Sequence, residues 1–325
     1  MINGSLVDAD AAPALDTSGD GDVAATTRIE LKFDRYMLPT DAIRQAICVR
    51  SVPGTVTNIN DCTSSVFLHP AYDPVRRVVT YYQDASQGSV LVPGQTYFLT
   101  VLPGSGPSGF QAFDGVALDK RYDFSFTPTA APANTGTEAP STDAGYCDGD
   151  NCLAGDRTVC RAEAALSRCS ACHAQPEPMS PLSPAMGLML TETDPKAAIA
   201  DLALTAVGKV AHETEQGGAA QHASDHPRRF GVSMAIVAPG DPGQSYLLYK
   251  ILSSSRFPLD PNDPNDAIAS GESDRLRLSV VTGVSMPAKG GASEDLAMDP
   301  SGWFAETEYI SAWIAAGAQL PVCKQ

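Results

Sequence analysis

Two cysteines and a histidine near the middle of the chain have the types and the spacing of groups that act together. Cys169, Cys172 and His173 form the motif C-x-x-C-H, which is the attachment signature of a c-type haem. Residues three apart lie on the same side of a helical turn, so both thiols can form thioethers to the two vinyl groups of one porphyrin. The adjacent histidine can then reach the iron as its proximal ligand. The motif predicts one covalently bound haem c.

Other chemistries use the same residue types. A zinc site needs a second pair of cysteines or histidines at finger spacing. The nearest pairs are Cys147 with Cys152 and His222 with His226, and neither completes a known finger. A redox-active C-x-x-C follows a strand of a βαβ unit, and no such pattern surrounds this motif. A plain disulfide is the remaining alternative, and haem is the favoured interpretation.

The charge balance limits the partners. The 325 residues carry a net charge of −16 at pH 7, which argues against nucleic acid and anionic membrane surfaces. It favours a redox partner protein with a basic surface. No apolar run approaches the roughly 18 residues of a transmembrane helix, so we expect no transmembrane segment. The N-terminus lacks the basic and apolar regions of a signal peptide, and we expect a mature form from which that peptide has been removed.

Cysteine usage indicates an oxidising compartment. Eight cysteines are present, and removing the haem pair leaves an even number, which suits disulfides in the periplasm, outside the cell or at the cell surface. The six are Cys48, Cys62, Cys147, Cys152, Cys160 and Cys323. Cys48 and Cys62 are the only two in the first 146 residues, so we expect them to pair. Closing a loop of this length stabilises the folded state by about 3 kcal/mol.

Composition divides the chain into four segments. Residues 128–146 are rich in Pro, Thr, Ala and Gly with almost nothing to bury, which is typical of a linker. Residues 1–25 are similarly small and polar, and we expect a flexible N-terminal tail. Residues 26–127 contain short β-forming runs, whereas residues 147–325 contain helical periodicity and the haem motif. Two domains suit a chain of this length.

Residues 26–127 are expected to form an all-β sandwich. Turn signals such as Pro93-Gly94 and Pro103-Gly104 separate short runs of β-forming residues. The runs are 28–33, 47–52, 65–68, 77–82, 96–101 and 122–126. Their spacing is typical of an immunoglobulin-like (Ig-like) sandwich. The segments 33–37, 91–97 and 117–127 resemble the bacterial Ig-like domains of secreted and surface proteins, which implies a module for positioning or docking.

Two helices are expected in residues 147–325. The first delivers the haem motif at its C-terminal end, and its shared face consists of Val159, Ala162, Leu166 and Cys169. The second spans 306–316, and its apolar positions are Ile310, Trp313, Ile314 and Gly317. Gly317 suits the position just past a helix end, and Pro321 prevents continuation. Such a pair of helices resembles the skeleton of a mainly α cytochrome c domain.

Three further segments carry this resemblance. Residues 238–247, the run Ser285-Met286-Pro287 with a following Gly-Gly pair, and residues 313–318 are similar to bacterial monohaem cytochrome c domains of multidomain secreted proteins. In that family the methionine before proline is the sixth haem ligand, which implies Met286. Because His173 and Met286 are 113 positions apart, we expect residues 190–280 to hold an insertion beside the haem. The family's crossing helices favour Cys160–Cys323 with Cys147–Cys152.

The chemistry of the sixth ligand supports Met286. A thioether favours ferrous iron and raises the reduction potential, and Pro287 restricts the backbone that presents it. The predicted iron ligands are therefore His173 and Met286. A vacant sixth position stays open as an alternative, as do other side chains. These are Met179, Met186, Met189, Met234, His212, His222 and His226.

The predicted function is electron transfer by one haem with His and Met ligands. Such transfer needs no acid, base or nucleophile, so we expect no catalytic residue and no enzymatic activity. The Ig-like domain is expected to position the haem within a surface-attached assembly. Two rival interpretations remain. One is a haem enzyme or gas sensor, peroxidase-like, with an open or displaceable sixth ligand, and the other is a surface scaffold or adhesion protein with accessory haem.

Overall fold

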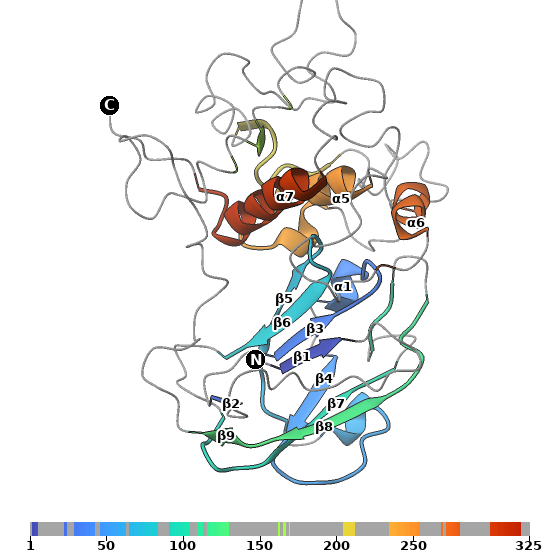
Figure 1. Cartoon of the computed structure of the whole chain (residues 1–325), viewed down its shortest axis with the longest axis vertical. Coiled ribbons are helices and arrows are strands. Elements are labelled where there is room, and N and C mark those ends of the chain that lie inside the picture. The colour runs from blue at the N-terminus through green and yellow to red at the C-terminus, as the bar shows by residue number, and fades with distance from the viewer. Residues whose placement is uncertain are drawn as a thin grey trace, which may run out of the picture. The chain divides into compact units, whose positions relative to one another are not determined.

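The structure is a computed structural model of the whole chain (Figure 1). It describes residues 2–5, 23–24, 29–42, 46–62, 65–83, 91–103, 109–112, 116–129, 162, 165–166, 169, 204–211, 234–253, 268, 271–279 and 300–319. The chain divides into two compact units. Unit 1 is Met1–Ala139 with Ala267–Ala269, and unit 2 is Pro140–Asp266 with Ser270–Gln325. The boundary falls within residues 128–146, the predicted linker.

The described part of unit 1 is β-rich. One sheet has the strand order β1-β3-β6-β5, and a second has the order β4-β7-β8 (Figure 1). Neighbouring strands are antiparallel, except that β1 runs parallel to β3. The strands are β1 (Ile2–Ser5), β3 (Ile29–Lys32), β4 (Ile47–Arg50), β5 (His69–Asp73), β6 (Val78–Tyr82), β7 (Tyr97–Val101) and β8 (Tyr122–Phe126). A separate parallel pair joins β2 (Val23–Ala24) to β9 (Pro128–Thr129).

Alternating burial explains why these residues form strands. Ile29 and Leu31 of β3 are buried, as are Val79 and Tyr81 of β6, while the residues between them are half-buried. Successive side chains of a strand point to opposite faces, so β3 and β6 each present one apolar face to the core. The predicted runs 28–33, 47–52, 77–82, 96–101 and 122–126 are confirmed as β3, β4, β6, β7 and β8.

The strand predicted at 65–68 is wrong, and the strand β5 begins at His69 instead. The residues before β5 lie beside β4. The N–H of Val66 donates to the carbonyl of Val49 over 2.7 Å, and the N–H of Val49 donates to the hydroxyl of Ser65 over 3.2 Å. The chain leaves the edge of one sheet and enters the other over a few residues. Composition does not reveal where the chain passes from one sheet to the other, because the residues before and after this point are β-forming alike.

Two short strands lie within the first 25 residues, where the sequence predicts a flexible tail. β1 extends the sheet beyond β3, and β2 pairs with β9. The edge of a sheet presents unpaired backbone N–H and C=O groups, and an added strand satisfies them whatever its side chains are. Pairing of this kind leaves no periodic pattern in the sequence.

Two fully buried tyrosines bind backbone groups through their hydroxyls. Tyr72 of β5 accepts a hydrogen bond from the N–H of Met37 over 2.9 Å. Tyr81 of β6 accepts one from the N–H of Ala46, the residue before β4. The second bond links the two sheets, because β6 and β4 belong to different ones. Burial strongly raises the pKa of both tyrosines.

A third tyrosine closes the turn before β7. Tyr97 is the first residue of this strand, and its hydroxyl accepts a hydrogen bond from the N–H of Val92 over 2.9 Å. Gly94 lies between them with a positive φ of 78°, a conformation that glycine adopts at no steric cost. The hydrogen bond fixes how the chain enters β7.

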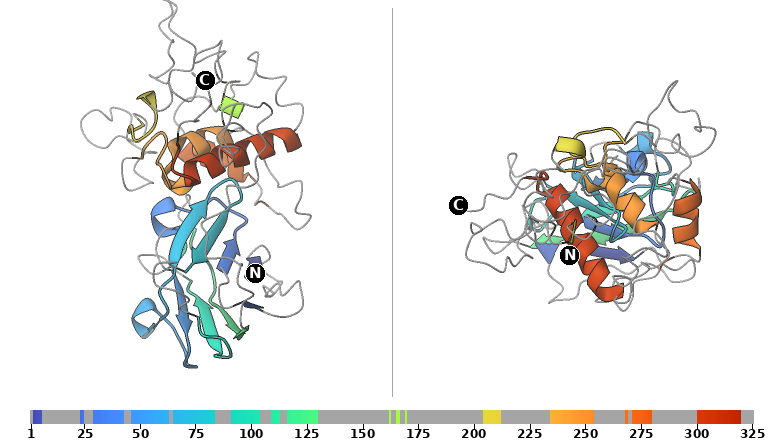
Figure 2. Two further views of the ribbon diagram at one scale, coloured as in Figure 1. Left: turned by 90° about the vertical axis from the view of Figure 1, so that its left-hand side faces the viewer. Right: turned by 90° about the horizontal axis from the view of Figure 1, so that it is seen from above.

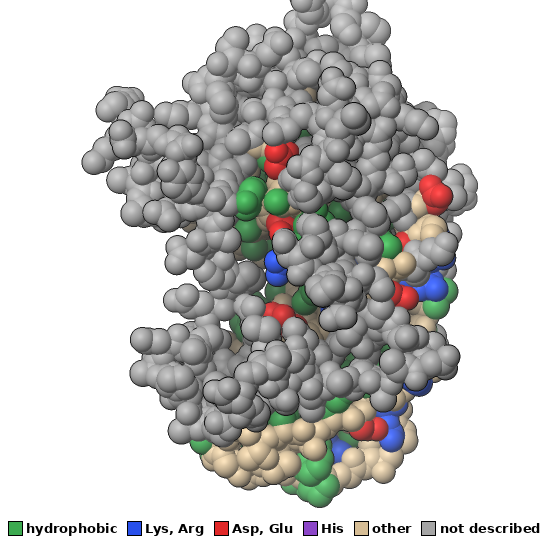
Figure 3. Space-filling model, in the orientation of Figure 1, with side chains coloured by type: hydrophobic (Ala, Val, Ile, Leu, Met, Phe, Trp, Pro, Cys, Tyr) green, Lys and Arg blue, Asp and Glu red, His purple; other side chains and the backbone are tan. Residues whose placement is uncertain are grey.

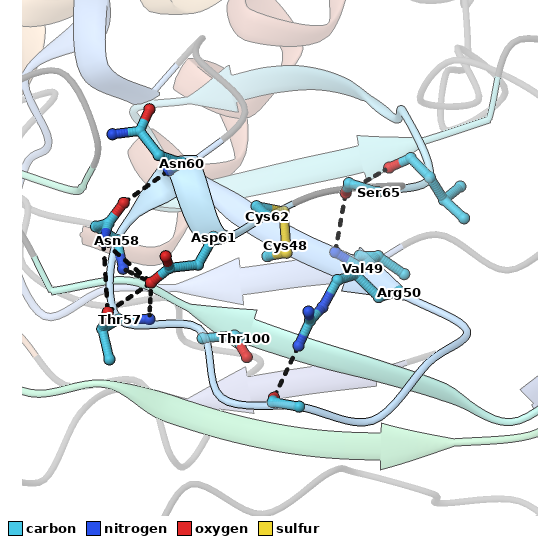
Figure 4. The surroundings of a disulfide bond; sticks show 12 residues. Cys48, Val49, Arg50, Thr57, Asn58, Asn60, Asp61, Cys62, Ser65 and Thr100 are labelled. Carbon is cyan, nitrogen blue, oxygen red and sulfur yellow. Dashed lines mark hydrogen bonds between the residues drawn. A yellow bond between two sulfur atoms is a disulfide. The ribbon is translucent and has the colours of Figure 1, made fainter.

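The predicted disulfide between Cys48 and Cys62 is confirmed (Figure 4). The two Cα atoms are 5.7 Å apart, within the usual range for a disulfide. Cys48 is buried and packs with Val56 and Leu102. Just before Cys62, the carboxylate of Asp61 accepts hydrogen bonds from the hydroxyl and N–H of Thr57. These bonds lower the pKa of Asp61 and brace the exposed loop that the disulfide closes.

Helices dominate the described part of unit 2. The helices whose bounds are described are the 3₁₀ turn η6 (Pro242–Gln244), α5 (Tyr246–Leu252), α6 (Glu272–Ser279) and α7 (Pro300–Ala315); residues 162, 165–166 and 204–205 are helical as well. α5 packs against both α6 and α7, and Figure 2 shows α5 in orange next to α7 in red. The helix predicted at 306–316 is confirmed as α7, which begins earlier, at Pro300. Proline suits a first helical position because its missing N–H would have no helical partner there.

Candidate functional site

Cys169 ends a short helical segment. Ala162, Ala165 and Leu166 are helical and buried, and Cys169 is half-buried. The N–H of Cys169 donates to the carbonyl of Leu166 over 2.9 Å. These positions recur at helical spacing on one face, as the sequence predicts for Ala162, Leu166 and Cys169. The helical residues before the motif are therefore buried, whereas the side chain of its first cysteine is partly accessible to solvent.

The rest of the predicted haem site lies outside the described residues. This applies to Cys172, to His173 and to Met286. It applies equally to the disulfide candidates Cys147, Cys152, Cys160 and Cys323. The ligand set and these disulfide pairings therefore stay predictions.

Met234 is the one alternative ligand that the structure describes. Its side chain is 1% exposed, and its carbonyl accepts a hydrogen bond from the N–H of Ala211 over 2.8 Å. Bridges from Val210 to Ala235 and from Val207 to Val237 continue this pairing. A buried methionine on a paired segment is typical of one that fills space in a core.

The C-terminal end of α7 has the geometry that the sequence predicts. Gly317 has a φ of 95°, and its N–H donates to the carbonyl of Ile314 over 2.9 Å. The N–H of Ala318 donates to the carbonyl of Trp313 over 2.9 Å. This pair of bonds is a Schellman motif, which confirms Gly317 as the residue just past the helix. The fully buried Trp313 also donates from Nε1 to the carbonyl of Gln319 over 2.9 Å.

The loop before α5 is bound to that end of α7. The N–H of Gly240 donates to the carbonyl of Ile314 over 2.7 Å. Within the loop, the hydroxyl of Ser245 accepts from the N–H of Ala238 over 2.8 Å and donates to the carbonyl of Asp241 over 3.0 Å. The structure thus brings together residues 238–247 and 313–318, two of the segments from which the sequence predicts a cytochrome c domain.

Asp241 is a half-buried carboxylate in this loop. Burial raises its pKa, while hydrogen bonds from the N–H groups of Gln244 and Gly243 act in the opposite direction. The bond from Gln244 to Oδ1 is 3.2 Å long and caps the turn η6. These roles of Asp241 and Ser245 are not among those predicted from the sequence. The signal was present, because aspartate followed by proline is a typical start of a helical turn.

No group of three or more His, Cys, Asp or Glu residues lies close enough together in the described ranges to hold a metal ion. None of the helices in those ranges has the length and apolarity that crossing a membrane requires.

Comparisons of the chain with protein-family models, with curated proteins and with solved structures give no match. The functional assignment therefore rests on the residues and on the geometry of the two units.

Proposed function

We propose that this protein is an electron carrier with one haem c, attached through Cys169 and Cys172 and ligated by His173 and Met286. The C-x-x-C-H motif carries the proposal, because its three residues supply two thioether positions and an iron ligand within five residues. The haem supplies a one-electron redox centre. Cys169 and Cys172 would hold it covalently, and His173 and Met286 would ligate the iron and exclude water from it.

The surroundings of Cys169 are compatible with attachment. A thiol that forms a thioether to a porphyrin must be reachable from the haem side, and Cys169 is half-buried. The helical residues before it, Ala162 and Leu166, are buried and would hold the motif in place. Buried small residues such as Ala165 allow close packing of that helix on its neighbours.

The strand order of unit 1 supports an Ig-like domain. The orders β1-β3-β6-β5 and β4-β7-β8 correspond to A-B-E-D and C-F-G of a constant-type Ig sandwich. Tyr97 lies at the start of β7, the strand that corresponds to F, and binds the backbone upstream at Val92. This is the position and the hydrogen bond of a tyrosine corner. The parallel pairing of β1 with β3 departs from the Ig pattern.

Unit 2 would then be the cytochrome c domain. The hydrogen bond from Gly240 to Ile314 joins two of the segments that carry the resemblance. The aromatic Trp313 lies on the C-terminal helix, as in the family's skeleton, and is fully buried. We assign unit 1 the role of positioning or docking this haem domain.

The proposed location is the periplasm, the cell surface or the space outside the cell. The disulfide between Cys48 and Cys62 supports an oxidising compartment. The proposed redox partner presents a basic surface to the acidic chain, whose net charge is −16. Encounter between opposite charges is accelerated at low salt and slowed as salt screens them.

Replacing both motif cysteines tests the assignment. The purified Cys169→Ala/Cys172→Ala protein should lose its haem into acid acetone, whereas the wild-type protein retains it in the precipitate. The matched control is Cys48→Ala/Cys62→Ala, which also removes two cysteines and should keep the haem attached. Haem that stays covalently bound without Cys169 and Cys172 would overturn the proposal.

A further inference from the structure

We draw no further inference here: the strongest candidate, a surface patch at the β9 end of unit 1 (Figure 3, lower end of the view), consists of the exposed side chains of Val52 and Val92 on two loops joined by a hydrogen bond, and nothing in the described part of the chain shows what covers it.

Discussion

The hydroxyl of Tyr97 and the N–H of Val92 are 2.9 Å apart, and their hydrogen bond ties the start of β7 to the loop before it. The ring of Tyr97 also stabilises the fold, because the residue is 3% exposed and its ring stacks with that of Phe126 in β8. One residue thus anchors β7 to a neighbouring strand and to the preceding turn.

Tyr97→Phe should therefore lower the free energy of unfolding of unit 1 by about 1–2 kcal/mol. The ring contacts are kept, and only the hydrogen bond to Val92 is lost. Urea denaturation followed by circular dichroism measures the change. Tyr82→Phe, at a half-buried position of β6, is the control and should have a smaller effect. Equal effects of the two substitutions would mean that the bond contributes nothing specific.

Removing the disulfide should destabilise unit 1 more strongly. Cys48→Ala/Cys62→Ala opens the loop and should lower the free energy of unfolding by about 3 kcal/mol. Wild-type protein treated with a reductant gives an independent measurement without the cavity that alanine leaves at buried Cys48. The two measurements should agree to within about 1 kcal/mol. A wild-type midpoint that does not respond to the reductant would contradict this expectation.

Unit 1 should unfold at alkaline pH because of its buried tyrosines. Burial raises the pKa of Tyr72 and of Tyr81 well above the ordinary value near 10. Above that value the unfolded chain loses these protons and the folded chain keeps them, so the folded state binds more protons and stability falls as pH rises. The stabilising contribution is complete below about pH 10.

An ultraviolet titration checks this pH dependence. Tyr72 and Tyr81 should ionise only together with unfolding. Tyr81→Phe should lower stability at neutral pH, because the N–H of Ala46 loses its acceptor, and should make the alkaline loss of stability less steep. A smooth titration of all tyrosines in the folded protein would contradict the prediction.

The sixth-ligand prediction concerns Met286. Met286→Ala should lower the reduction potential, open the iron to carbon monoxide or cyanide, and remove the weak band at the red end of the oxidised spectrum. Met234→Leu is the better control than an alanine substitution, because Met234 is buried and leucine keeps most of its volume. If Met286→Ala keeps the wild-type spectrum and potential, another residue is the ligand.

The division of the chain predicts independent folding. Residues 147–325, matured with haem, should keep the spectrum and nearly the potential of the full protein. Residues 1–127 should form a β-rich, haem-free domain with the Cys48–Cys62 disulfide. A changed axial ligation in the shortened haem protein would mean that unit 1 takes part in the haem pocket.

The sequence by itself determined the features whose cause is local. Runs of β-forming residues located β3 and β6, and Cys48 and Cys62 were paired because the first 146 residues contain no other cysteine. The end of α7 at Gly317 followed from glycine's freedom to adopt a positive φ. The haem motif proposed at Cys169 is equally local, since covalent attachment would need only residues within one or two helical turns.

Only the tertiary structure decided which distant segments meet. It placed β5 at His69 rather than at 65–68, and it paired β2 with β9. It also buried Arg77, which the sequence assigns to the start of a strand; the residue has a φ of 56° and donates from Nε to the carbonyl of Phe33 over 3.2 Å. Sheet edges and buried polar groups are satisfied by backbone atoms far along the chain. Because every residue carries the same backbone groups, the choice among these partners depends on the folded arrangement and leaves no mark on residue type.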